Sequence, residues 1–305
     1  MIKTIGFIGL GNMGQGMASQ LLKHGFNVHG FDIDIAKTSK FAELGGLVCH
    51  SVQEVCAHAK VIITMLPRDE HVRQVLLSKN GVVDFAQKGT LVLEMSTIFP
   101  ATSMEINSEL LKAGLRMMDA PVGRTPQDAL KGTLLVMVGG DKKDFDFALP
   151  IFQAMANKVI YLGATGSGIR MKVINNYMSM VSMVLTAETL AMASKAGIDM
   201  ATATEVLQNT VAGRGQINVN YPRKVLAGDI TPDFPIVLGR KDLALALKLG
   251  EELNTPLYLG AVASQLFSTA CAQGRADQDC TAMLLALEQL GGSNSSVIFT
   301  GHKHD

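Results

Sequence analysis

The sequence predicts an α/β fold in its first half, with a mostly parallel, doubly wound sheet, and an all-α domain in its second half. Two patterns predict this division. Up to about residue 163, short β-branched runs alternate with amphipathic helical segments, which is typical of a parallel sheet with helices on both faces. Beyond Gly168 the strand pattern stops, and long helical patterns rich in Leu, Ala and Met replace it. The glycine-rich segment 163–168 marks the change.

The individual elements follow in chain order. Seven segments have the composition of strands, namely 4–9, 27–32, 60–67, 90–96, 114–122, 133–140 and 158–163. Segments such as 13–25 and 103–114 repeat apolar residues at helical spacing and end in a glycine that suits a helix C-cap. Segment 175–193 is the most apolar helix, but its polar side chains disfavour a membrane span, so we expect a buried helix. Residues 222–235 form the main irregular break.

The domain organisation follows from the same pattern. We expect a first domain over residues 1–163, a second over 164–294 and a disordered tail over 295–305. Two histidines in the tail, His302 and His304, are expected to be solvated rather than to bind a metal ion. No metal site is predicted elsewhere.

Composition limits the possible functions. A chain of 305 residues is long enough for two cores, and 48% hydrophobic against 18% charged residues excludes a disordered protein. The formal net charge is zero, which disfavours a nucleic-acid partner. The four cysteines form no CxxC pair, and glycines interrupt the N-terminus too often for a signal peptide. We therefore expect free thiols, a cytoplasmic location and no membrane partner.

A GxGxxG turn lies between the first predicted strand and the first predicted helix, with glycines at Gly9, Gly11 and Gly14. The first permits the turn, the second lets a pyrophosphate approach the backbone, and the third permits close helix packing. The unpaired N–H groups and the positive N-terminus of the helix that follows favour phosphate. These features together predict a dinucleotide site.

The second predicted strand ends in Asp32, at the distance expected for a carboxylate that binds ribose hydroxyls. A 2′-phosphate would be repelled by this carboxylate, and no arginine is adjacent, so NAD(H) is favoured over NADP(H). The positive charge of Lys37, five residues further on, weakens this argument for NAD(H). Asp34 is interpreted as a solvated loop acid.

Two further strand ends follow the same logic. Met65, Leu66 and Pro67 end one predicted strand, and Ser96 with Thr97 ends the next. Open parallel sheets bind ligands outside the carboxyl ends of their strands, so these residues are candidates to line the nicotinamide. The alternative interpretation is that these residues only form turns between strand and helix and bind no ligand.

A lysine and two amides mark the start of the long helical segment. Lys172, Asn175 and Ser179 share one helix face at i, i+3 and i+7, and Asn176 borders it. Reduction of a carbonyl by hydride requires a proton donor, and Lys172 could supply the proton. The alternative is a lysine that extends along an apolar surface beside capping asparagines. Lys241 is a weaker candidate of the same kind, and could simply be exposed.

In combination these segments resemble the β-hydroxyacid dehydrogenases, the family that includes 3-hydroxyisobutyrate dehydrogenase and tartronate semialdehyde reductase. The resemblance covers nearly the whole chain and rests on GFIGLGNMG, TMLP, EMSTIFP, DAPVGRT with GTLLVMVGG, GIRMKVINNYMS and RKDLALAL. It implies a Rossmann domain, a helical domain with a long interdomain helix, and a homodimer or homotetramer. It also implies Lys172 as the acid/base, Asn175 or Asn176 at the substrate, and Lys241 near cofactor and substrate.

The turn after Val122 departs from the usual family pattern of Ser-Gly-Gly and reads Gly123-Arg124-Thr125. This variant is most similar to 3-sulfolactaldehyde reductases, which implies NAD contacts from Asn12, Met13, Asp32, Leu66, Thr97 and Lys241, and substrate contacts from Arg124, Asn175 and Ser179. A planar, permanently charged guanidinium suits a sulfonate or a carboxylate. Pairing of Arg124 with Asp128, or simple exposure, is the alternative.

The expected reaction is therefore NADH-dependent reduction of a short anionic aldehyde, with 3-sulfolactaldehyde giving 2,3-dihydroxypropane-1-sulfonate. Three carboxylate reactions remain alternatives: those of 3-hydroxyisobutyrate dehydrogenase, tartronate semialdehyde reductase and succinic semialdehyde (4-hydroxybutyrate) dehydrogenase. A non-catalytic NAD(H)-binding sensor is a rival from another functional class. An imine reductase on the same fold is less favoured, because such enzymes usually replace the lysine.

Overall fold

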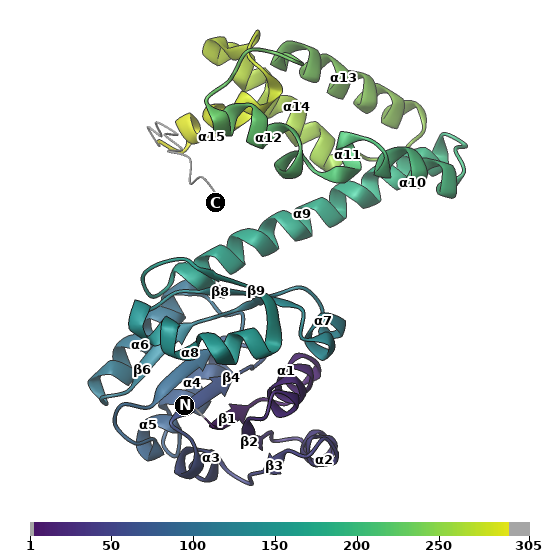
Figure 1. Ribbon diagram of the computed structural model, residues 1–305. Coiled ribbons are helices and arrows are strands. Elements are labelled where there is room, and N and C mark those ends of the chain that lie inside the picture. The colour runs from purple at the N-terminus through teal and green to yellow at the C-terminus, as the bar shows by residue number, and fades with distance from the viewer. Residues whose placement is uncertain (1–2, 293–305) are drawn as a thin grey trace. The chain divides into compact units, whose positions relative to one another are not determined.

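The computed structural model describes residues 3–292, so the predicted tail with His302 and His304 lies outside the described residues. The chain divides into two compact units with the boundary between Met178 and Ser179, and each unit is described by itself (Figure 1). The first unit continues past residue 163 because Ile169 is fully buried in its core. The predicted domain boundary after residue 163 stays a prediction.

The first unit is built on a six-stranded sheet with the order β3-β2-β1-β4-β5-β6. Every pair of neighbouring strands is parallel, which confirms the predicted sheet. The strands are β1 (Thr4–Ile8), β2 (Asn27–Phe31), β3 (Leu47–Val48), β4 (Val61–Thr64), β5 (Leu91–Glu94) and β6 (Arg116–Asp119). The two-residue β3 was not predicted, because a strand this short carries no detectable alternation.

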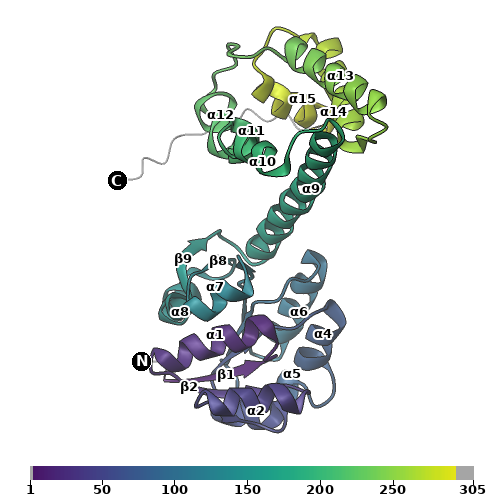
Figure 2. The same ribbon diagram turned by 90° about the vertical axis from the view of Figure 1, so that its right-hand side faces the viewer.

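Helices cover both faces of this sheet (Figure 2). Met17 and Leu21 of one helix and Phe152 of another pack on one face, whereas Val72 and Ile106 pack on the opposite one. The helices of this region are α1 (Asn12–Lys23), α2 (Ile35–Glu43), α3 (Val52–His58), α4 (Asp69–Leu77), α5 (Val82–Phe85), α6 (Pro100–Lys112), α7 (Pro126–Lys131) and α8 (Lys142–Met155). The doubly wound architecture is thereby confirmed.

A second sheet of three strands follows, with the order β7-β8-β9. Its members are β7 (Val122–Gly123), β8 (Leu134–Val138) and β9 (Ala156–Tyr161), with β7 antiparallel to β8 and β8 parallel to β9. The prediction of a single strand over 114–122 is wrong: the chain leaves the first sheet after Asp119 and enters the second at Val122. Pro121 lies at the break, where its missing N–H cannot extend a ladder.

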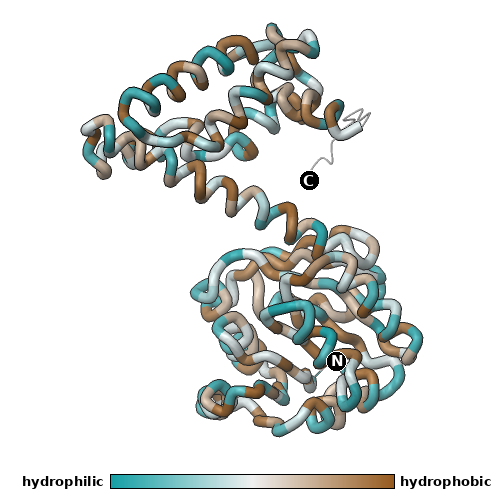
Figure 3. Tube along the Cα trace, turned by 180° about the vertical axis from the view of Figure 1, so that it is seen from behind, coloured by the Kyte–Doolittle hydropathy of each residue, from teal (hydrophilic) through white to brown (hydrophobic). Residues whose placement is uncertain are grey.

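Helix α9 (Ser167–Lys195) is the longest of the described helices. The prediction that 175–193 is buried is wrong for the single chain, since Tyr177 is 72% exposed, Met183 63% and Met180 53%. The apolar residues of this helix do not form one stripe, and brown turns recur along it in Figure 3. One neighbouring element cannot cover such a helix.

The described part of the second unit is helical, as predicted. Besides the end of α9 it contains α10 (Met200–Gln208), α11 (Val211–Arg214), α12 (Asn220–Arg223), α13 (Ile236–Glu252), α14 (Tyr258–Ala270) and α15 (Met283–Leu290), with short 3-10 or π segments between them. Its core is small, and Ile236, Ala270 and Ala282 are fully buried in it. The irregular break at 222–235 is tied by Lys224, whose Nζ lies 2.9 Å from Asp229 Oδ2 and 3.1 Å from Asp233 Oδ1.

Candidate functional site

The glycine turn after β1 is packed so tightly that two of its glycines have no room for a side chain. A Cβ on Gly9, whose φ is +100°, would lie 2.3 Å from the Met65 carbonyl oxygen. A Cβ on Gly14 would lie 2.0 Å from the Gly9 carbonyl oxygen. A Cβ on Gly11, in contrast, would meet nothing within 4 Å. The first and third glycines therefore hold the turn against β4 and α1, and the second leaves its backbone open to a ligand.

The N-terminus of α1 is free to receive an anion. Asn12 is its first residue and Gly11 its N-cap, and within residues 3–292 no side chain caps it. No acid occurs in its first turn, so its partial positive charge is not neutralised locally. Helix α2 differs, because the Asp34 carboxylate accepts the Ala36 N–H at its N-terminus. An open glycine followed by an uncapped helix end fits a pyrophosphate.

Asp32, just after β2, is held in place by the backbone. Its Oδ2 accepts the Leu10 N–H at 2.7 Å, and its Oδ1 accepts the Asp34 N–H at 2.9 Å. Lys37 Nζ lies 3.9 Å from Oδ1 and 3.7 Å from Asp34 Oδ2. The carboxylate is therefore oriented at the carboxyl end of β2, beside the glycine turn, with one cation next to it.

Two large apolar side chains beside Asp32 were missed by the sequence reasoning. Ile33 is 90% exposed and Ile35 80% exposed. Isoleucines this exposed, directly after Asp32 and on either side of Asp34, suit a flat apolar ring such as adenine. The signal was present as Asp-Ile-Asp-Ile, but it looks like an ordinary loop in the sequence.

The loops after β4 and β5 are linked to each other. The Leu66 N–H donates to Ser96 Oγ at 2.9 Å, and the Ser96 N–H donates to Glu94 Oε1 at 2.8 Å. Ser96 is fully buried, whereas Thr97 and Pro67 are exposed. The Leu66 side chain also lies beside Gly9, since a Cβ there would be 3.0 Å from Leu66 Cδ2. These loops and the glycine turn thus form one continuous rim of the sheet.

Two buried acids lie beneath this rim, and the sequence reasoning missed both. Glu94 ends β5 and Asp119 ends β6, opposite each other in register, and neither is exposed. Burial raises the pKa of Glu94 to about 7, and the nearby Asp119 contributes in the same direction. Burial also raises the pKa of Asp119, which backbone N–H groups oppose. In the sequence each acid looks like an ordinary strand end, and only the register brings them together.

Asp119 holds the start of α9. The Gly166 N–H donates to its Oδ1 at 2.7 Å, and the Ile169 N–H donates to its Oδ2 at 2.8 Å. Lys172 lies one turn further along α9, is half-buried, and has its pKa lowered by that burial. On the same helix, Asn175 Nδ2 donates to Asn176 Oδ1 at 3.3 Å.

Arg124 follows β7 with φ +78°, in the left-handed region that favours glycine. Its Nη1 donates to the Thr133 carbonyl oxygen and, at 2.7 Å, to Asn157 Oδ1. Asp128 forms a capping box with Thr125 at the start of α7 and no ion pair with Arg124. The pKa of Asp128 is lowered mainly by its hydrogen bonds to Thr125, with a smaller contribution from the charge of Arg124. Gly123 is buried within β7.

The three-stranded sheet separates Arg124 from the start of α9. Thr133 precedes β8 and Asn157 is the second residue of β9, whereas Gly139, beyond the other end of β8, lies close to Ser167 of α9. In this structure the guanidinium therefore points to one end of the sheet, and α9 starts at the other. The structure brings together Gly9, Gly11, Gly14, Asp32, Met65 and Leu66, but it does not bring the guanidinium to Lys172.

The remaining candidates belong to the second unit. Ser179 is its first residue, on α9. Lys241 lies on α13, is exposed, and has its Nζ 3.2 Å from Asp242 Oδ1. A hollow of about 560 Å³ is lined by Lys241, Arg240, Ser264 and Ser268 together with apolar residues.

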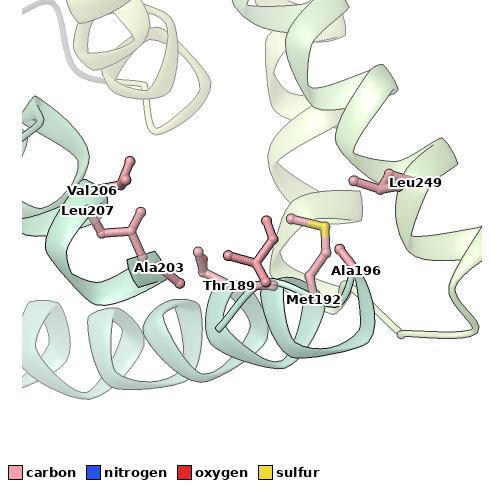
Figure 4. A pocket seen from close by; sticks show the side chains of 9 residues that line it. Thr189, Met192, Ala196, Ala203, Val206, Leu207 and Leu249 are labelled. Carbon is pink, nitrogen blue, oxygen red and sulfur yellow. The ribbon is translucent and has the colours of Figure 1, made fainter. Parts of the chain in front are cut away.

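Another cavity of the second unit, of about 230 Å³, lies between α9, α10 and α13 (Figure 4). Its lining consists of Thr189, Met192, Ala193, Ala196, Ile198, Ala203, Val206, Leu207 and Leu249. No charged side chain lines it, so it does not suit an anionic substrate. Within the described residues, no cluster of His, Cys, Asp or Glu could hold a metal ion, and no helix is long and apolar enough to cross a membrane.

Two family models match successive parts of the chain. The model described as the NAD binding domain of 6-phosphogluconate dehydrogenase matches residues 4–163. The model described as the NAD-binding region of NADP-dependent 3-hydroxyisobutyrate dehydrogenase matches residues 166–287. The two matches meet near the glycine-rich segment that precedes α9.

Individual relatives match over almost their whole length. The chain is 38% identical to 3-sulfolactaldehyde reductase of Escherichia coli (strain K12), over 96% of this chain and 99% of that protein. It is 35% identical to mitochondrial 3-hydroxyisobutyrate dehydrogenase of Rattus norvegicus, over 93% and 87%. Among solved structures, Mycobacterium tuberculosis 3-hydroxyisobutyrate dehydrogenase with L-serine matches with a TM-score of 0.66 and 32% identity, over 94% of this chain and 99% of that one.

Proposed function

Because the chain belongs to the β-hydroxyacid dehydrogenase family typified by 3-hydroxyisobutyrate dehydrogenase, we propose that it uses NADH to reduce 3-sulfolactaldehyde to 2,3-dihydroxypropane-1-sulfonate. Membership makes the protein a nicotinamide-dependent oxidoreductase acting on CH–OH groups of small hydroxyacids or their aldehydes. The proposal adds the sulfonate, the reducing direction and the preference for NADH. The observation that carries it is Arg124 in place of the small residues usual for this turn.

The preference for NADH rests on Asp32. Its two oxygens already accept backbone N–H groups, which orient the carboxylate and leave lone pairs for ribose hydroxyls. A 2′-phosphate in that position would meet the carboxylate charge. Lys37, 3.9 Å away, compensates only in part because it also approaches Asp34. We therefore place the ribose at Asp32, the pyrophosphate at Gly11 and the N–H groups of Asn12 and Met13, and the nicotinamide beside Met65, Leu66, Pro67 and Thr97.

Lys172 is the proposed proton donor. The bound cofactor supplies the hydride, and the developing negative charge on the substrate oxygen requires a proton from an adjacent acid. Burial lowers the pKa of Lys172, so its ammonium gives up a proton more readily than an exposed lysine would. Asn175, Asn176 and Ser179 continue along the same helix and are proposed to orient the substrate, with Lys241 near cofactor and substrate.

Arg124 is the proposed anion-binding residue, with help from the turn at Gly123 and Thr125. An arginine at φ +78° is strained where glycine would not be, and its presence there supports a functional role for the side chain. Only its Nη1 has recorded partners within residues 3–292, which leaves Nη2 and Nε for a sulfonate. To act near Lys172, the guanidinium must leave Thr133 and Asn157 and turn toward α9.

Substrate comparison tests this function. We expect kcat/KM with NADH to be at least tenfold higher for 3-sulfolactaldehyde than for tartronate semialdehyde, succinic semialdehyde or the aldehyde of 3-hydroxyisobutyrate. A carboxylate preferred by tenfold would assign the chain to that reaction and leave the family intact. Tight NADH binding without turnover of any of these aldehydes would indicate a sensor.

An oligomer is also proposed, as a homodimer or homotetramer. Met180, Met183 and Leu185 are each more than half exposed on α9 although they are strongly apolar. Burying one such side chain stabilises an interface by roughly 1.5–3 kcal/mol, so a second copy is expected to cover them. Light scattering of the purified protein should give at least twice the mass of one chain, and a monomer over all concentrations would contradict the proposal.

A reducing, cytoplasmic environment is proposed from the cysteines. The described chain contains four free cysteines, of which Cys49 and Cys56 are buried. Burial raises the pKa of Cys49 to about 11 and that of Cys56 to about 12, so both thiols stay protonated and unreactive near neutral pH.

A further inference from the structure

The buried acids Glu94 and Asp119 are not explained by packing. Both lie at the carboxyl ends of neighbouring strands, and each is fully buried. A buried carboxylate is costly unless it is hydrogen-bonded, and two neighbouring ones repel each other. The hydrogen bonds of Asp119 connect it to the helix that carries Lys172, and those of Glu94 connect it to the loops proposed to bind the nicotinamide.

Asp119 leads to the proton donor. Its Oδ1 accepts the N–H of Gly166, directly before α9, and its Oδ2 accepts the N–H of Ile169, in the first turn of α9. A carboxylate at this end of a helix is also favoured by the helix dipole. Lys172 is three residues beyond Ile169 on a continuous helix, so the position and rotation fixed at Ile169 also fix the direction of Lys172.

The surrounding backbone leaves this connection little freedom. A Cβ on Gly139 would lie 2.8 Å from Asp119 Oδ1 and 2.7 Å from Ser167 Oγ. A Cβ on Gly168 would lie 2.5 Å from the Met137 carbonyl oxygen and 2.6 Å from that of Asp119. The first turn of α9 is therefore pressed directly onto the ends of β6 and β8.

Glu94 leads to the cofactor side. Its Oε1 accepts the Ser96 N–H, and Ser96 Oγ accepts the Leu66 N–H, which fixes the loop beside Gly9. Its Oε2 has no hydrogen-bond partner among the described residues. One acid therefore ties down the helix with the lysine, and its neighbour ties down the loops assigned to the nicotinamide.

We propose that Asp119 and Glu94 are positioning residues that set the proton donor on α9 relative to the nicotinamide loops. Asp119 acts through the first turn of α9, and Glu94 acts through Ser96 and Leu66. Neither is proposed to touch substrate or cofactor. The inference rests on the proposed role of Lys172, and it applies to whichever aldehyde the wild-type protein reduces.

Asp119→Asn tests the first connection. Asparagine keeps the shape but has one acceptor oxygen, so it cannot hold both the Gly166 and the Ile169 N–H groups. A lysine misplaced by about 1 Å can cost on the order of 10²-fold in rate, so kcat should fall by about that factor while KM for NADH stays within about twofold. Asp144→Asn is the matched control, because Asp144 is likewise a buried acid. It lies in the first turn of α8 and pairs with Arg116 at the other end of β6, away from α9.

A double-mutant cycle separates positioning from general damage. If Asp119 acts through Lys172, adding Asp119→Asn to Lys172→Ala should lower the remaining kcat by less than about threefold. If the double variant instead lost kcat by the product of the two single-variant factors, the proposal would be overturned. An Asp119→Asn variant that keeps wild-type kcat and only loses melting temperature, as expected for Asp144→Asn, would also overturn it. Failure of the sulfonate assignment would leave this cycle measurable with another aldehyde.

Ser96→Ala tests the second connection and remains informative if Asp119→Asn does not fold. It leaves the Leu66 N–H without its acceptor, so KM for NADH should rise by about tenfold, equivalent to one lost hydrogen bond. Thr90→Val is the control, since the Thr90 hydroxyl is buried just before β5 and has no hydrogen-bond partner within residues 3–292. Equal KM values for NADH in Ser96→Ala, Thr90→Val and the wild type would overturn the role of Glu94 and Ser96.

Discussion

The two ends of the candidate site are held in different ways. At the cofactor end, Gly9, Gly14 and Asp32 are fixed by backbone contacts within the first unit. At the substrate end, Lys172 depends on the seating of α9, and Arg124 bonds to groups at the far end of the three-stranded sheet. The first end is therefore preformed, whereas the proposed substrate site would form only after a side-chain movement that brings both cations to one ligand. Cofactor affinity should tolerate changes at the substrate end.

Lys172→Ala should give the largest effect, and it should lower turnover without weakening cofactor binding. Loss of a general acid typically costs 10²- to 10⁴-fold, so kcat should fall within about that range. The dissociation constant of NADH, measured by fluorescence titration, should change by less than about threefold, because no cofactor contact is removed. Retained turnover would remove the assignment of Lys172 as the proton donor.

The pH dependence of the wild-type enzyme sharpens the same assignment. Reduction requires the protonated lysine, so kcat should fall as the pH rises through the pKa of Lys172. Burial lowers that pKa, which places the fall below the ordinary value of 10.5. Steady-state rates between neutral and alkaline pH measure the midpoint.

Arg124 offers a test in which stability and binding are expected to diverge. Arg124→Ala removes a charge-assisted contact of about 1.5–3 kcal/mol, so KM for the sulfonate should rise by about 10- to 100-fold. Arg124→Gly should raise KM equally but be about 1 kcal/mol more stable than Arg124→Ala, because glycine adopts φ +78° without strain. Urea unfolding of both variants measures the difference. A wild-type KM in both would make the arginine structural.

Glu94→Gln should affect stability more than binding. Since the folded-state pKa of Glu94 is raised to about 7 from 4.5, the folded protein binds more protons than the unfolded chain between these values. Stability therefore falls as the pH rises from about 4.5 to 7 and stays low above it. Glu94→Gln should therefore raise the free energy of unfolding by up to about 3 kcal/mol at pH 8 and by almost nothing at pH 4.5, because glutamine is neutral at both. Denaturant unfolding at both pH values measures this, and equal differences at both would contradict it.

Local sequence patterns predicted the strand, glycine turn and helix of the proposed cofactor end, because the physical causes of this geometry are local. The glycine spacing, the strand before it and the acid after the next strand all lie within residues 4–32. The helix face with Lys172 follows from periodicity alone. The acid pair could not be predicted, since Glu94 and Asp119 are neighbours only through the register of β5 and β6. The partners of Arg124 also escaped prediction, because Asn157 lies 33 residues away in sequence.

The exposure of α9 shows another limit. An apolar composition predicts burial, but it does not say whether the covering surface comes from the same chain. Tyr177 and Met183 are exposed in the single chain, although they belong to the most apolar helix. The apolar composition therefore predicted burial of this helix, which the single chain does not provide.

Lys37→Ala should have the smallest effect, and it tests how the cofactor end distinguishes NADH from NADPH. The ammonium lies 3.9 Å from Asp32 Oδ1, beside the position proposed for the ribose. It would offset part of the repulsion between Asp32 and a 2′-phosphate, whereas NADH carries no group that needs it. An exposed charge interaction of this kind is worth about 0.2–1 kcal/mol, so kcat/KM for NADPH should fall by up to about fivefold and that for NADH should stay within about twofold. Steady-state kinetics with both cofactors decide the point, and an equal loss for both would show that Lys37 only orients Asp32.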